Sequence, residues 1–65
     1  MLYYKLVTGR ELLKLLKANG WIVDRIRGSH HIVTKGDKTI TVPVHGAKDI
    51  PKGTVAAILK EAGLR

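Results

Sequence analysis

Two short glycine turns divide the middle of this chain into three extended segments. Gly28-Ser29 separates residues 21–27 from residues 30–35, and Gly36-Asp37 separates the latter from residues 38–44. Glycine tolerates positive φ, and a two-residue loop containing glycine is typical of a tight β-hairpin. The segments are rich in Val, Ile and Thr, which favour strands. The turns therefore predict an antiparallel meander of three strands.

The segments before and after this meander have helical features. Thr8 and Glu11 have the spacing of a capping box, which predicts a helix from about Gly9 to Asn19. Gly20 is then suited to the left-handed position that ends a helix. Its apolar arc contains Leu12, Leu13, Leu15 and Leu16. The opposite side contains Arg10, Lys14 and Lys17, which we interpret as a solvated stripe, with contact to phosphates as the alternative.

A second helix is expected after the meander, over residues 53–62. Val55, Ile58, Leu59 and Ala62 form its apolar stripe, and Gly63 follows it. Residues 47–52 are predicted to be a loop, with Asp49 as a possible helix cap.

The length limits the fold class to a compact single domain. A chain of 65 residues buries only about 60% of its unfolded surface, and without cysteine no disulfide can stabilise it. We expect an α+β domain over residues 1–65 with the order α-β-β-β-α, and with residues 1–7 as a lead-in. Both helices should cover one face of a three-stranded antiparallel sheet, the face with Ile40, Val42 and Val44.

The turns also predict which face of the sheet each histidine occupies. If Gly36-Asp37 is a two-residue turn, His31 lies opposite Val42 and shares the apolar face. His30 then projects from the open face, where the Gly28-Ser29 turn places Arg27 opposite it. Two positively charged side chains beside a histidine, Arg25 and Arg27, suit a phosphodiester ligand.

This register leaves two inconsistencies in the first strand. It places Asp24 on the apolar face, and it places Trp21 and Ile32 on the open face. A longer turn, or a bulge near Asp24, would remove the first inconsistency.

The charge indicates a polyanionic partner. Twelve Lys and Arg residues outnumber five Asp and Glu residues, for a formal net charge of +7. Such a balance points first to nucleic acid, and then to an acidic protein or a membrane surface. The chain has no Phe and only three Tyr and Trp residues, which argues against recognition by stacking several bases. We see neither a signal peptide nor a membrane-spanning segment.

The histidines have different expected roles. His30 is the candidate acid–base group, because imidazole titrates near neutral pH and this one follows a turn beside Arg27; the alternative is an exposed histidine without a role. We expect His31 to lie under the sheet with its nitrogens bonded, and His45 to be a surface residue or a second proton-transfer group. Neighbouring strand residues point to opposite faces, so His30 and His31 cannot easily share one ion, and no carboxylate or cysteine cluster completes a ligand set. We therefore expect no metal site, and we expect no cofactor.

The ordered motifs resemble the HicA toxin family over nearly the whole chain from Thr8 onward. The resemblance rests on Gly20-Trp21, Arg27-Gly28-Ser29-His30-His31-Ile32, Ile40-Thr41-Val42-Pro43-Val44-His45-Gly46, Lys48-Asp49-Ile50, Gly53-Thr54 and Ile58-Leu59-Lys60-Glu61-Ala62-Gly63-Leu64.

This resemblance implies a specific activity and partner. HicA proteins are small mRNA interferases of toxin–antitoxin pairs, with a fold similar to the double-stranded-RNA-binding domain, held inactive by a HicB antitoxin. The family's catalytic histidine follows Gly-Ser, which corresponds here to His30. We therefore expect a cytoplasmic, metal-independent endoribonuclease that contacts RNA through Arg25, Arg27 and Gly28-Ser29.

Two other functions are compatible with the same residues. One is a non-catalytic RNA-binding domain of the same fold, and the other is a protein-interaction module whose basic face docks an acidic partner. If the chain is a toxin, we expect an acidic antitoxin that covers the face with His30.

Overall fold

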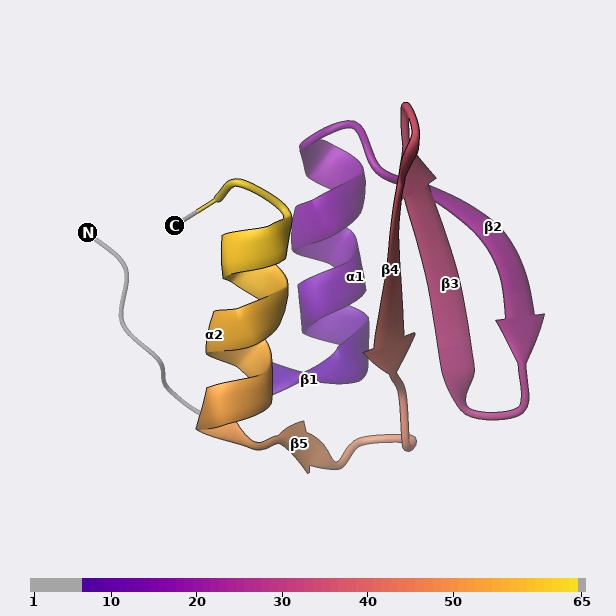
Figure 1. Cartoon of the computed structure of the whole chain (residues 1–65). Coiled ribbons are helices and arrows are strands. Elements are labelled where there is room, and N and C mark those ends of the chain that lie inside the picture. The colour runs from indigo at the N-terminus through magenta and orange to yellow at the C-terminus, as the bar shows by residue number, and fades with distance from the viewer. Residues whose placement is uncertain (1–6, 65) are drawn as a thin grey trace.

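The computed structural model describes residues 7–64, so that most of the lead-in over residues 1–7 lies outside the described residues. Two helices stand side by side against one face of a three-stranded sheet (Figure 1). The elements are β1 (Val7–Thr8), α1 (Gly9–Ala18), β2 (Ile22–Arg27), β3 (His30–Lys35), β4 (Lys38–Pro43), β5 (Asp49–Ile50) and α2 (Lys52–Glu61).

The predicted α+β architecture is confirmed. The sheet order is β2-β3-β4 with antiparallel neighbours, and both helices lie on the face of Ile40 and Val42. Pro43 ends β4, an edge strand, where a residue without a backbone N–H is tolerated. Gly28 and Gly36 have φ of 60° and 63°, as the two-residue turns require.

A small second sheet was not predicted. Val7 and Thr8 of β1 pair antiparallel with Ile50 and Asp49 of β5, which joins the start of α1 to the approach to α2. Asp49 is therefore a strand residue, and its predicted role as a helix cap is wrong. The N-cap of α2 is Pro51, and its first turn has no side-chain cap.

Both ends of α1 are fixed as the sequence predicts. The backbone N–H of Glu11 donates to Thr8 Oγ1 at 3.2 Å, and Glu11 Oε1 accepts from the Thr8 N–H at 2.9 Å. At the other end Gly20 has φ of 93°, and the N–H of Trp21 donates to the Leu16 carbonyl at 3.0 Å. The N–H of Gly20 also donates to the Lys17 carbonyl, at 3.1 Å. These two hydrogen bonds end the helix and reverse the chain into β2.

The register of the sheet matches the prediction near both turns and departs from it at a bulge. Arg27 lies opposite His30, and His31 lies opposite Val42. Between Val23 and Arg25 the register shifts, so that Asp24 is an extra residue. As a result, the residues of this segment that precede Asp24 lie on the opposite face of the sheet from the one that uninterrupted alternation predicts.

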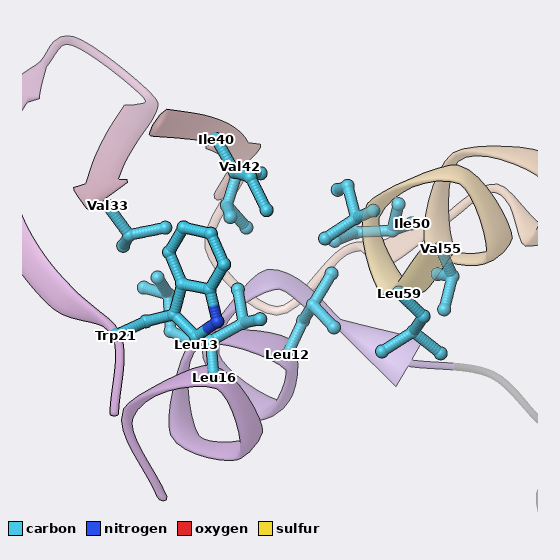
Figure 2. Close-up of a cluster of buried hydrophobic side chains, with 11 residues drawn as sticks. Leu12, Leu13, Leu16, Trp21, Val33, Ile40, Val42, Ile50, Val55 and Leu59 are labelled. Atoms are coloured by element: carbon cyan, nitrogen blue, oxygen red, sulfur yellow. The ribbon is translucent and has the colours of Figure 1, made fainter. Parts of the chain in front are cut away.

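The bulge corrects the predicted position of Trp21. Its side chain is only 3% exposed, whereas Ile22 is 68% exposed on the open face. Figure 2 shows the indole of Trp21 between the leucines of α1 and Val33 of β3. Leu15, predicted on the apolar arc of α1, is 39% exposed and does not belong to the described core cluster.

Candidate functional site: an open basic face and a groove behind it

His30 is held at the end of the sheet by its neighbours on both sides. It is the first residue of β3, directly after the Gly28-Ser29 turn, and it pairs with Arg27 and with Pro43. The Ser29 carbonyl accepts a hydrogen bond from the Val44 N–H at 2.7 Å, which ties the turn to the end of β4. The pairing and this hydrogen bond fix the backbone of His30, and its exposed side chain remains accessible.

The open face combines this histidine with positive charge. Arg25 and Arg27 are exposed, and the alternation along β2 places both on the face of His30. Arg25 Nε lies 3.4 Å from Asp24 Oδ2, and the two side chains are 61% and 50% exposed. An exposed pair of this kind contributes little, so Arg25 stays available to a ligand. Arg27 has no ion pair within residues 7–64.

His31 lies on the other face, as predicted, but its surroundings differ from the expectation. The residue is half-buried, and its Nδ1 is buried without a hydrogen-bond partner among the described residues. The expectation that its nitrogens are bonded is therefore wrong for Nδ1. His45 is exposed in the loop after β4, where its carbonyl accepts from the Lys48 N–H at 3.0 Å.

A groove on the helix-facing side was missed by the sequence interpretation. It runs between α1 and the uncovered part of the sheet. Its lining contains the whole basic stripe of α1, for which the sequence predicts a solvated face or a contact to phosphates but no groove. The lining residues are Arg10, Leu13, Lys14, Lys17, Val23, Ile26, His31 and Val44.

Other kinds of site are not seen in the described part of the chain. Residues 7–64 contain no group of three or more His, Cys, Asp or Glu side chains placed to hold a metal ion. Neither of the helices in this part is long and apolar enough to cross a membrane.

The fold and the open face define a small, basic α+β domain with an exposed histidine beside two arginines. Residues 9–64 match the family model described as the HicA toxin of bacterial toxin–antitoxin systems. The chain therefore belongs to the HicA toxin family. A similar protein is the "Probable mRNA interferase HicA" of Pseudomonas fluorescens (strain Pf0-1), which is 36% identical over 55 residues, covering 85% of this chain and 92% of the relative.

Proposed function

We propose that this toxin is a metal-independent endoribonuclease, an mRNA interferase, with His30 as its catalytic acid–base group. The observation that supports this most is the position of His30: an exposed imidazole on a fixed turn, opposite Arg27, on the open face of a domain with net charge +7. The similarity to a protein named as a probable mRNA interferase points to the same substrate class.

The reaction requires no external nucleophile, because RNA provides its own 2′-OH. In the proposed step His30 accepts the proton of the 2′-OH while the 2′ oxygen bonds to the adjacent phosphorus. The bond from phosphorus to the 5′ oxygen breaks, and that oxygen takes a proton from His45, Lys48 or water. The products are a 2′,3′-cyclic phosphate and a free 5′-OH. Arg27 stabilises the negative charge on the non-bridging oxygens as it develops.

We also propose a HicB-type antitoxin as the neutralising partner in the cytoplasm. The face with His30 is open and basic, so an acidic surface laid over it would both bind well and exclude RNA. A cognate complex that inhibits cleavage while leaving His30 open to solvent would rule out this steric mechanism.

The activity is tested by incubating purified toxin with RNA in EDTA. We expect the RNA to be cleaved although EDTA removes divalent metal ions, because the proposed reaction uses only side chains and the 2′-OH. RNA binding without cleavage would instead support the non-catalytic RNA-binding domain, and absence of both would support the protein-interaction module.

The contribution of the two arginines is tested by their joint replacement. We expect Arg25→Ala with Arg27→Ala to weaken RNA binding across sequences, and to reduce the slope of log K against log salt by about 0.7 for each lost phosphate contact. The matched control is Lys38→Ala with Lys60→Ala, which removes the same charge at exposed positions outside the proposed site. Equal effects of the two pairs would mean that only net charge matters.

A further inference from the structure

The groove behind the sheet has two unlike walls. One wall is the basic stripe of α1, namely Arg10, Lys14 and Lys17. The other is formed by Val23 and Ile26 of β2, and the volume between them is about 560 Å³. It lies on the sheet face opposite to His30, because Ile26 pairs with His31 and Arg27 pairs with His30.

The β2 wall exposes apolar surface that the fold leaves uncovered. Ile26 is 59% exposed although it shares the face on which the helices pack. Figure 1 shows the reason: β2 is the sheet edge farthest from α2 and curves away from the helices. The β2 wall, Val23 and Ile26, continues into Val44 and Leu13, and we call these four residues the apolar floor of the groove. An exposed apolar surface of this kind favours burial by another chain.

The charges around this floor all have one sign. Within the part of the chain that the structure describes, the lining contains three cationic side chains and no Asp or Glu. The imidazole of His31 also lines the groove, but its Nδ1 is buried and therefore does not face an occupant. A complementary occupant has carboxylates for the α1 wall and apolar side chains for the floor.

We propose that this groove docks an acidic, amphipathic segment of the antitoxin. Carboxylates of the segment pair with Arg10, Lys14 and Lys17, while its apolar side chains cover Val23 and Ile26. The proposal rests on the proposed antitoxin partnership and is independent of the nuclease activity. It adds an anchor on the helix side of the sheet to the proposed covering of His30 on the open side.

The lining favours a protein segment over RNA as the occupant. Single-stranded RNA uses aromatic platforms to stack its bases, and no Phe, Tyr or Trp among the described residues lines the groove. An RNA strand has only phosphates and polar sugar edges to place on Val23 and Ile26, which leaves the apolar floor poorly used. An amphipathic peptide matches both the floor and the charged wall.

The test compares two matched pairs of variants. Ile26→Glu places a carboxylate in the groove, and Ala57→Glu places one at an exposed position of α2, outside the groove lining and away from the open face that the antitoxin is proposed to cover. Lys14→Glu alters the α1 wall, and Lys60→Glu makes the same charge reversal on α2. The probe is the antitoxin protein whose co-expression restores growth, purified and titrated into each variant in a His30→Ala background. Thermal unfolding first verifies that each variant is folded.

We expect Ile26→Glu and Lys14→Glu each to weaken antitoxin binding by about tenfold or more, and the controls to change it by less than about threefold. If Ile26→Glu does not fold, Ile26→Ser and Lys14→Glu provide the same comparison. Unchanged binding by the groove variants would overturn the proposal, as would an equal loss with Ala57→Glu. The Lys14→Glu variant is also assayed for RNA cleavage with His30 retained. If it no longer cleaves RNA while its antitoxin affinity is unchanged, the proposal is overturned and the groove is assigned to RNA. A wild-type toxin that fails to cleave RNA contradicts the proposed nuclease function alone.

Discussion

Replacing His30 by alanine is expected to abolish RNA cleavage and cell toxicity while leaving the fold intact. The side chain is exposed, so its removal opens no cavity in the core. What it deletes is the proposed proton-transfer group, and one positioned general acid or base contributes about 10²–10⁴-fold to a rate. The measurements are single-turnover cleavage of a defined RNA in EDTA, growth on induction, and thermal unfolding of the purified variant.

The adjacent His31→Ala variant is the natural control, because it changes the same residue type on the other face. The sequence alone predicts that His31→Ala lowers the free energy of unfolding by about 1–3 kcal/mol if His31 is buried and hydrogen-bonded. Because Nδ1 has no partner within residues 7–64, we expect a loss at the lower end of that range, and we expect the variant to retain RNA cleavage. A folded His30→Ala protein that cuts at the wild-type rate would falsify the assignment. A stable but inactive His31→Ala protein would mean that His31, on the groove side of the sheet, is the catalytic histidine. A shift of the strand register could not explain that result, because the observed pairing fixes His31 opposite Val42.

Gly9→Ala should destabilise the domain by about 3 kcal/mol, the upper part of the range for overpacking a core. Gly9 is buried at the start of α1, and an added Cβ would meet the Pro43 carbonyl oxygen and lie 2.8 Å from Val44 Cα. These are backbone atoms, so the helix or the end of β4 has to move. Because the Val44 N–H holds the Ser29 carbonyl, the same movement should disturb the turn before His30. Denaturant unfolding and cleavage assays on the variant measure both effects.

Gly53→Ala is the control for this substitution. Gly53 lies in the first turn of α2, and an added Cβ there has no neighbour within 4 Å among residues 7–64. Alanine in place of glycine in a helix is favourable by about 0.5–1 kcal/mol, so this variant should be as stable as the wild type or more so. Equal stability of Gly9→Ala and the wild type would show that α1 and β4 are not packed as closely as described.

The meander was predictable because its turns leave little freedom. A two-residue loop fixes which residues pair, and the pairing then fixes the face of every side chain in β3 and β4. The helix limits followed from the capping box at Thr8 and the left-handed Gly20. The bulge at Asp24 could not be predicted with the same certainty, because a single extra residue leaves no clear periodic signal in the sequence. Without the bulge, the alternation along β2 places Trp21 on the wrong face.

The two sides of the candidate site differ in how far the sequence reveals them. The open face follows from strand alternation, which places His30 with Arg27 without knowledge of the helices. The groove depends on where α1 lies relative to the edge strand β2, which is a tertiary feature. Helical periodicity separated Arg10, Lys14 and Lys17 from the leucines, yet it does not show whether such a polar side faces open solvent or a neighbouring strand.

The most direct measurement is the digestion in EDTA of two RNAs that differ only at the cleaved linkage. One has the natural 2′-OH there, and the other has a 2′-deoxy nucleotide at that position. We predict that the wild-type toxin cleaves the first to a 2′,3′-cyclic phosphate and a 5′-OH, that it leaves the second intact at this linkage, and that His30→Ala cleaves neither. Cleavage of the deoxy-substituted linkage, or products with a 5′-phosphate, would contradict the proposed attack by the 2′-OH.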